Sequence, residues 1–142
     1  MTNKTNLKAT SARGRILFLD DNADTCELVS LILGQAGYEV VLGRSVAEGL
    51  QLTRDKGFDL ILLDWFLEDG TGIDLCRAVR KFDGATPIFF YTGMAYEHHL
   101  STALQAGAQG CLVKPVEMET LLKTIADRLG SKGHTDSKGT IT

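Results

Sequence analysis

The sequence is poor in the residues that define several classes of protein. Its 142 residues include two prolines, one tryptophan and three cysteines, and no apolar run approaches the length of a membrane-spanning helix. Cys26, Cys76 and Cys111 lie far apart and form no CxxC or Cys/His pattern, which argues against a disulfide framework or a zinc site. We interpret them as buried free thiols in a reducing cytoplasm.

The sequence also lacks a basic surplus and a signal peptide. Its net charge is −3, whereas nucleic-acid-binding domains usually carry a basic footprint. The polar N-terminal stretch does not resemble a secretory leader. We therefore expect a cytoplasmic protein that binds neither nucleic acid nor membrane. The adjacent His98 and His99 are interpreted as surface residues rather than metal ligands, because neighbours on a helix point to different sides.

What the sequence does contain is a regular alternation of two patterns. Short apolar runs indicate strands at residues 16–19, 39–42, 59–63, 87–91 and 110–113. All but the second run are nearly continuous, which is typical of parallel strands covered on both faces. Segments with helical periodicity follow each run. These repeats predict an α/β fold: a doubly wound (βα)5 sheet of order 2-1-3-4-5 in a flavodoxin-like three-layer sandwich.

The expected domain occupies residues 14–130. Residues 1–13 and 131–142 are rich in Thr, Ser, Gly and Lys and offer little to bury, so both tails are expected to be disordered. No internal repeat or second domain is visible, so we expect no output domain in this chain.

Local signals indicate where several helices begin and end. Ser45 and Glu48 form a capping-box pattern, and Gly37 and Gly107 stand where helices should end. In the first helix, residues three and four apart predict the face that packs on the sheet. We expect that face to be centred on Leu28, Leu31 and Ile32, with Cys26, Val29 and Leu33 beside it.

Polar residues interrupt the apolar pattern where strands end. Asp20 and Asp21 follow the first strand, Asp64 the third, Thr92 the fourth and Lys114 the fifth. The carboxyl ends of an open parallel sheet form one edge, where such folds bind ligands, and the order 2-1-3-4-5 makes the first and third strands neighbours. Three carboxylates at one edge require a counterion, so the pattern predicts a hard divalent cation. Mg²⁺ fits best, and Mn²⁺ could substitute for it.

Four segments, "LFLDDN", "LILLDWFLEDGTGIDL", "FFYTG" and "LVKPV", occur in an order and spacing that resemble the receiver domain of two-component response regulators. The resemblance covers residues 15 to about 130. It implies that Asp64 is the phosphoacceptor. It also implies that Asp20, Asp21 and Asp64 hold Mg²⁺ together with the backbone carbonyl of Phe66.

The resemblance assigns further residues to the phosphoryl group. It implies that the Thr92 hydroxyl and the Lys114 ammonium contact the group, as do backbone N–H groups of Trp65 and Gly93. It also implies a cis peptide bond between Lys114 and Pro115.

Three positions depart from the family pattern. Phe66, two residues after Asp64, offers no polar side chain to position water, which predicts slow hydrolysis of the phosphorylated protein. Glu68 stands where members usually carry proline, which should cost some rigidity of the loop. Cys111 stands where an aromatic residue usually acts with Thr92 as a switch, and a cysteine is too small to report phosphorylation in that way.

The resemblance implies a signalling module and not an enzyme, with at most slow autophosphorylation from small phosphodonors and slow autodephosphorylation. A histidine kinase or histidine phosphotransfer protein would supply the phosphoryl group, and an effector would bind the face made by the fourth helix, fifth strand and fifth helix. Two alternatives stay open: a degenerate receiver that binds partners without phosphorylation, and an aspartate-nucleophile phosphohydrolase. The second needs an Asp-x-Asp pair where this sequence has Asn22. A flavin-binding protein is disfavoured because the first loop has no phosphate-cradling Ser/Thr/Gly run.

Overall fold

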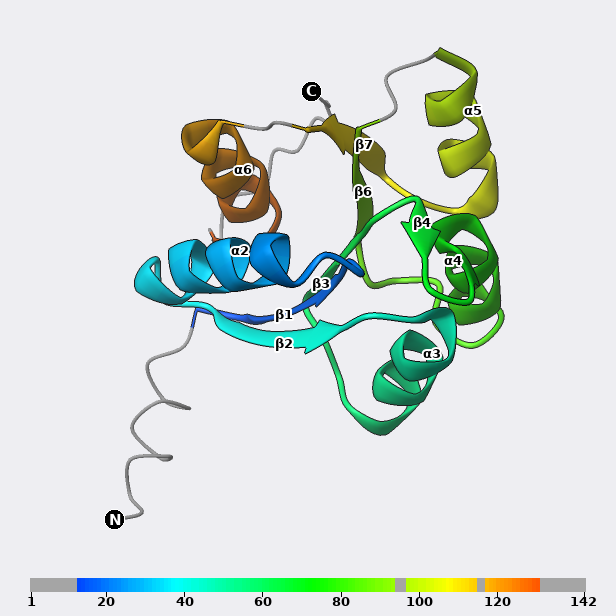
Figure 1. Ribbon diagram of the computed structural model, residues 1–142, viewed down its shortest axis with the longest axis horizontal. Helices are drawn as coiled ribbons and strands as arrows, with labels where there is room; N and C mark the ends of the chain where they lie inside the picture. Colours follow the sequence, from blue (N-terminus) through cyan, green and yellow to red (C-terminus); the bar gives the residue numbers. More distant parts are fainter. Residues whose placement is uncertain (1–12, 94–96, 115–116, 131–142) are drawn as a thin grey trace.

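The computed structural model describes residues 13–93, 97–114 and 117–130 (Figure 1). Its main sheet is parallel and has the order β2-β1-β3-β6-β7. Numbered along the chain, this is the predicted order 2-1-3-4-5, and the flavodoxin-like α/β fold is confirmed. The strands are β1 (Arg15–Leu19), β2 (Glu39–Gly43), β3 (Leu60–Leu63), β6 (Ile88–Thr92) and β7 (Gly110–Val113).

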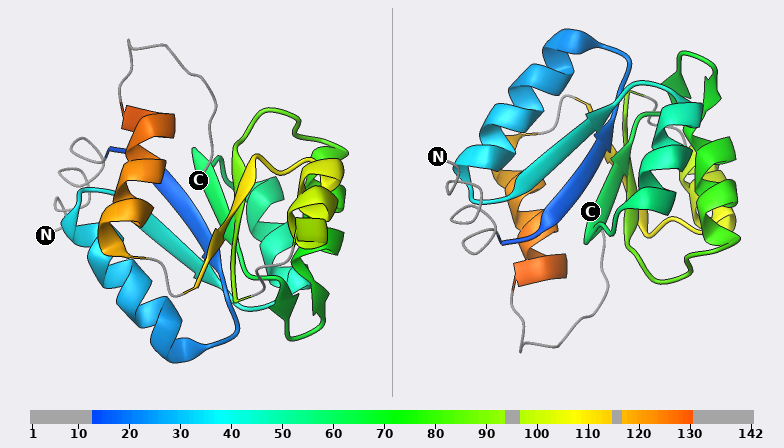
Figure 2. Two further views of the ribbon diagram at one scale, coloured as in Figure 1. Left: turned by 90° about the horizontal axis from the view of Figure 1, so that it is seen from above. Right: turned by 90° about the horizontal axis from the view of Figure 1, so that it is seen from below.

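Helices cover both faces of the sheet (Figure 2). One face carries α2 (Ala23–Gln35) and α6 (Met118–Ile125), which continues into the π-helical turn η1 (Ala126–Gly130). The other face carries α3 (Val46–Asp55), α4 (Gly72–Arg80) and α5 (Glu97–Ala106). Alternate residues of β1 serve the two cores: Leu17 and Leu19 pack beneath α4 and α5, and Ile16 and Phe18 beneath α2 and α6.

The strand register places the ends of the central strands level with one another. Leu19 lies opposite Leu63 in β1 and β3, so Asp20 and Asp64 leave the sheet together. The Asp64 N–H donates to the Leu19 carbonyl at 2.9 Å, and the Lys114 N–H donates to the Thr92 carbonyl at 2.7 Å. The sheet itself therefore brings the predicted polar residues to one edge.

A short hairpin follows Asp64 that the sequence pattern did not predict. It consists of β4 (Phe66–Leu67) and β5 (Gly70–Thr71), in which Phe66 pairs with Thr71. This two-stranded element leads directly into α4.

The predicted buried face of the first helix is wrong. Leu28 and Leu31 are 52% and 57% exposed, whereas the buried residues of α2 are Cys26, Val29 and Leu33. Two overlapping apolar stripes run along this helix, and hydrophobicity alone does not say which one meets the sheet. The structure seats the helix on the stripe that carries the smaller side chains.

The predicted helix ends are confirmed. Gly37 and Gly107 adopt positive φ values of 101° and 110° after α2 and α5. The Ser45 hydroxyl accepts the Glu48 N–H at 3.0 Å, and the Glu48 carboxylate accepts the N–H of Arg44 at 2.9 Å.

The predicted tails lie outside the described residues, apart from Arg13. Its N–H donates to the Gly37 carbonyl at 2.8 Å, and its guanidinium lies 4.9 Å from the centre of the Tyr38 ring. None of the helices in the described ranges has the length and apolar character needed to cross a bilayer.

Candidate functional site

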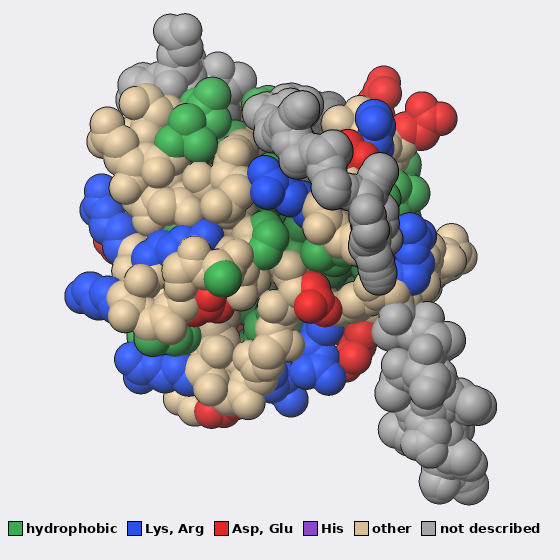
Figure 3. All heavy atoms as spheres, turned by 180° about the vertical axis from the view of Figure 1, so that it is seen from behind, with side chains coloured by type: hydrophobic (Ala, Val, Ile, Leu, Met, Phe, Trp, Pro, Cys, Tyr) green, Lys and Arg blue, Asp and Glu red, His purple; other side chains and the backbone are tan. Residues whose placement is uncertain are grey.

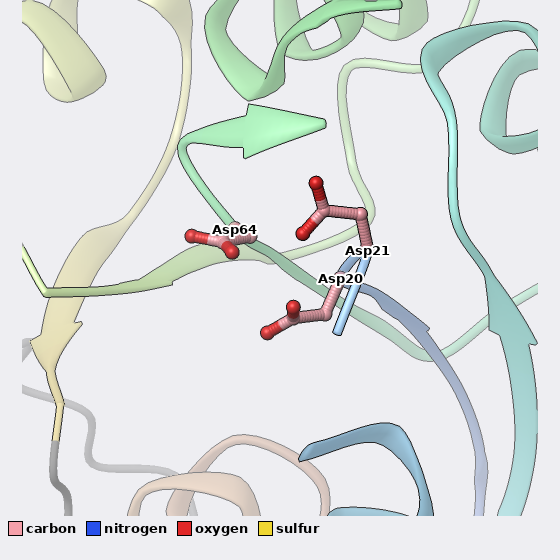
Figure 4. Close-up of side chains that lie close together, drawn as sticks. All are labelled: Asp20, Asp21 and Asp64. Atoms are coloured by element: carbon pink, nitrogen blue, oxygen red, sulfur yellow. The ribbon is translucent and has the colours of Figure 1, made fainter. Parts of the chain in front are cut away.

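Three carboxylates meet at the carboxyl ends of β1 and β3 (Figure 4). One oxygen from each of Asp20, Asp21 and Asp64 lies within 4.8 Å of the others. The three differ in environment: Asp20 is fully buried, Asp64 is partly buried and Asp21 is exposed. The sheet thus places two acids inside the protein and leaves the third open to water.

The buried Asp20 is held by its own loop and by a distant lysine. Its Oδ1 accepts the N–H of Asn22 at 2.9 Å, and its Oδ2 accepts from Lys114 Nζ at 2.8 Å. Its N–H donates to the Gly43 carbonyl at 3.1 Å. A buried carboxylate without such partners would cost several kcal/mol, so these bonds are what allow Asp20 to sit at the sheet edge.

Lys114 pairs with both buried acids. Its ammonium lies 2.8 Å from Asp20 and 3.4 Å from Asp64, and its side chain is 27% exposed. Burial by itself lowers the pKa of Lys114, but the hydrogen bond to Asp20 and the charges of Asp64 and Asp20 outweigh it, so the pKa is raised. Lys114 is therefore a fixed cation at the site.

Asp64 is strained electrostatically. Its Oδ1 accepts the backbone N–H of Trp65 at 2.7 Å, and its Oδ2 faces Lys114. Burial, and next the charge of Asp20, raise the pKa of Asp64, while Lys114 and the Trp65 N–H oppose the rise. Ionised Asp64 therefore lowers the free energy of unfolding of the metal-free protein.

This donor set fits a divalent cation. Among the described residues, Asp20 and Asp64 share one ammonium as their ion-pair partner, so one lysine offsets the charge of two carboxylates. Carboxylate oxygens are the ligands that Mg²⁺ prefers, and Mg²⁺ is usually held by one or two of them together with water. Asp20, Asp21 and Asp64 would hold the ion.

We expect Asp64→Asn to stabilise the metal-free protein. A carboxyl whose pKa is raised on folding favours the folded state below its ordinary pKa, and that contribution is lost as the pH rises through the raised value. At neutral pH the neutral amide should therefore raise the free energy of unfolding. The gain should shrink as the pH falls and the wild-type carboxyl takes up its proton.

Urea denaturation in the presence of a chelator measures this effect. Asp127→Asn is the control, because Asp127 is exposed and pairs with Lys123 on the helix surface. An Asp64→Asn protein no more stable than wild type at neutral pH would refute the assignment of strain to Asp64.

Gly72 is a positioning residue that the sequence pattern did not single out. A Cβ at Gly72 would overlap the backbone carbonyl oxygen of Asp64 and come within 2.8 Å of the Phe90 ring. Its N–H donates to the Trp65 carbonyl at 2.8 Å. The backbone of α4 therefore packs directly on the backbone that carries Asp64, which only glycine allows.

The Glu68 departure has a structural counterpart in Arg44. The Arg44 guanidinium lies 3.7 Å from the Glu68 carboxylate and donates to the Asp21 carbonyl at 3.0 Å. Asp69 accepts the N–H groups of Val46 and Ala47 at 2.6 and 3.2 Å. Side-chain contacts thus hold the hairpin after Asp64 to the loop before α3. These contacts restrain the hairpin at a position where family members usually carry a proline.

The remaining predicted site residues lie on the same edge. Thr92 is the last residue of β6 and is 2% exposed, and Gly93 follows it with open space where a Cβ would stand. The Phe66 side chain is 54% exposed. Pro115 lies outside the described residues.

Cys111 and His99 contact the part of the core next to Asp64. Cys111 is partly buried against the cluster that contains Trp65 and Phe90, and burial raises its pKa to about 11. His99 is partly buried, with its ring edge-on to Trp65 at 4.8 Å. The interpretation of His99 as a surface residue is therefore wrong. No sequence signal points to this contact, because it joins two segments more than thirty residues apart.

Comparison with known proteins identifies the family. A family model described as the response regulator receiver domain matches residues 16–126. The chain belongs to this family. Among solved receiver domains, that of a response regulator receiver domain protein from Methanospirillum hungatei is similar, with a TM-score of 0.77 and 32% identity over 81% of this chain and 92% of that one.

Curated relatives of this receiver domain are longer proteins. The uncharacterized transcriptional regulatory protein YkoG of Bacillus subtilis is 33% identical over 91% of this chain and 57% of its own length. The sensor histidine kinase AruS of Pseudomonas aeruginosa is 34% identical over 79% of this chain and 12% of its own. The receiver domain thus spans about half or less of these two relatives.

Proposed function

We propose that this receiver domain accepts a phosphoryl group on Asp64 and signals through it. The observation that carries the proposal is the environment of the Asp64 carboxylate. It lies beside two further carboxylates and within 3.4 Å of the Lys114 ammonium, at the open end of the sheet. A nucleophilic carboxylate flanked by cation ligands and a fixed cation suits phosphoryl transfer.

In the proposed step, one carboxylate oxygen of Asp64 attacks the phosphorus of the donor. An O–P bond forms, and the P–N bond of a phosphohistidine breaks. The departing imidazole keeps the electron pair of that bond and takes up a proton from solvent. The attacking oxygen of the ionised Asp64 carboxylate carries no proton, so the step needs no general base.

The chain's own residues would stabilise and orient the transferred group. Lys114, now paired with Asp20 and Asp64, would pair with a phosphoryl oxygen, and the Thr92 hydroxyl and the N–H groups of Trp65 and Gly93 would bind the others. When bound at Asp20, Asp21, Asp64 and the carbonyl of Phe66, Mg²⁺ would supply positive charge against the equatorial oxygens.

A histidine kinase or a histidine phosphotransfer protein is the proposed donor. The similarity to a protein named a sensor histidine kinase supports this class of partner. An effector is proposed to bind the face of α5, β7 and α6. This face exposes Leu100, Leu104 and Val113 by 40%, 48% and 42%, and hydrophobic side chains are exposed at the upper left of Figure 3, where α5 lies.

Two rival functions are less well supported. A phosphohydrolase would need a second acid at position 22, but Asn22 caps α2 there by accepting the N–H of Thr25 at 2.8 Å. A degenerate receiver would have no reason to keep a buried Asp20 paired with Lys114. Turnover of a generic phosphate ester would support the first rival, and failure to take up phosphate would support the second.

The proposal is tested by incubating the protein with Mg²⁺ and a small acyl phosphate and measuring its intact mass. We expect the wild type to gain the mass of one phosphoryl group and Asp64→Asn to gain none. An equal gain in both proteins would exclude Asp64 as the acceptor.

A further inference from the structure

We propose that Trp65 and His99 couple the chemical state of Asp64 to helix α5. This inference rests on the proposed phosphorylation of Asp64 and adds the route by which that event reaches the α5 surface. It concerns two residues that bind neither the metal nor the phosphoryl group through their side chains.

Trp65 is bonded to the acceptor carboxylate through its backbone. Its N–H donates to Asp64 Oδ1 at 2.7 Å, and its carbonyl accepts the N–H of Gly72 at 2.8 Å. The two peptide groups on either side of the Trp65 Cα are therefore held by different partners. The first depends on the charge of Asp64, whereas the second belongs to the fixed start of α4.

The Trp65 side chain reaches from this backbone to α5. The indole is 7% exposed and contacts two rings: Phe90 of β6 at 5.1 Å with an interplanar angle of 48°, and His99 of α5 at 4.8 Å with an angle of 81°. An edge-to-face pair of this kind has a defined geometry. His99 therefore follows the position of the indole.

Phosphorylation changes the acceptor on which the Trp65 N–H depends. When one Asp64 carboxylate oxygen bonds to phosphorus, the product is an acyl phosphate and the carboxylate loses its charge. The strong acceptors are then the oxygens of the phosphoryl group. The N–H turns toward these oxygens while the carbonyl stays on Gly72, so the Trp65 Cα absorbs the rotation. Because the indole is closely packed, its displacement is passed to the rings that touch it.

This route does not need an aromatic side chain at position 111. Cys111 lies opposite Phe90 in the β6–β7 register and packs in the same cluster as Trp65, but its side chain is short. The aromatic contact between the site and α5 is instead made by Trp65, whose ring touches His99. The next residues along α5 include the exposed Leu100 and Leu104, so a shift at His99 alters a surface suited to a partner.

The test is an amide chemical-shift comparison with and without Mg²⁺ and beryllofluoride, a mimic of the phosphoryl group. In the wild type we expect shifts at Asp64 and Trp65 and across residues 99–106. His99→Ala should keep the shifts at Asp64 and Trp65 and the affinity for the mimic, but lose most of the response of α5. Leu100→Ala is the control, because Leu100 lies on the same helix and is 40% exposed, and it should respond as the wild type does.

Trp65→Leu gives an independent check, since it removes the ring but keeps the backbone N–H. It should show the same loss of response at α5. A full α5 response in His99→Ala or Trp65→Leu would overturn the coupling and leave the proposed function intact. A wild-type protein that shows no shift at Asp64 and no phosphoryl uptake would overturn both.

Discussion

Replacing Gly72 by alanine is expected to lower the free energy of unfolding by about 3 kcal/mol or more. The added methyl group would overlap the backbone carbonyl oxygen of Asp64 and press on the Phe90 ring. A flexible side chain could change rotamer to make room for the methyl group. The Asp64 carbonyl oxygen lies at the end of a central strand and cannot move without disturbing the sheet. The same substitution should weaken Mg²⁺ binding, because the backbone that carries Asp64 must shift.

Gly34→Ala is the matched control for this prediction. Gly34 lies within α2 and has nothing within 4 Å of an added Cβ. Alanine there should stabilise the protein by about 0.5–1 kcal/mol through its helix propensity. Urea denaturation of both variants measures the contrast. If Gly72→Ala proved as stable as wild type, α4 would not pack on the Asp64 backbone as described.

Replacing Lys114 by methionine should have two opposite effects. In the metal-free protein it removes the ammonium that lies 2.8 Å from the fully buried Asp20, so the free energy of unfolding should fall by about 3 kcal/mol. Mg²⁺ should then bind more tightly than in the wild type, because no side-chain cation competes for Asp20 and Asp64. The stabilisation by Mg²⁺ should therefore be larger in the variant.

Thermal unfolding with a chelator and with a series of Mg²⁺ concentrations measures both effects. Lys123→Met is the control, because the Lys123 side chain is 76% exposed and its pair with Asp127 lies on the surface. The two lysine variants should differ clearly without metal. Equal stability of the two variants in chelator would show that Lys114 does not compensate the charge of Asp20.

The sequence was sufficient to predict the sheet order and the edge at which the polar residues gather. Near-continuous apolar runs define buried parallel strands, and a residue that follows such a run must lie at the carboxyl edge. The register then brings Asp20 beside Asp64, because Leu19 pairs with Leu63. These features follow from the local hydrophobic pattern and from the rules of parallel sheets, and both can be applied to a single sequence.

Features that depend on packing between distant segments could not be predicted. The choice between two apolar stripes on α2, the overlap that excludes a side chain at Gly72, and the contact of Trp65 with His99 each require the positions of two elements. Alternating or helical periodicity describes one element at a time. The Glu68–Arg44 pair escaped prediction for the same reason.

Asp64 is the proposed acceptor of the phosphoryl group. The most direct measurement is to treat the protein with Mg²⁺ and a small acyl phosphate, reduce the acyl phosphate with borohydride, and locate the change by peptide mass. We expect a Mg²⁺-dependent conversion at Asp64 alone, absent from Asp64→Asn and from samples with chelator. Conversion at another residue, or none in a folded wild-type protein with Mg²⁺ present, would contradict it.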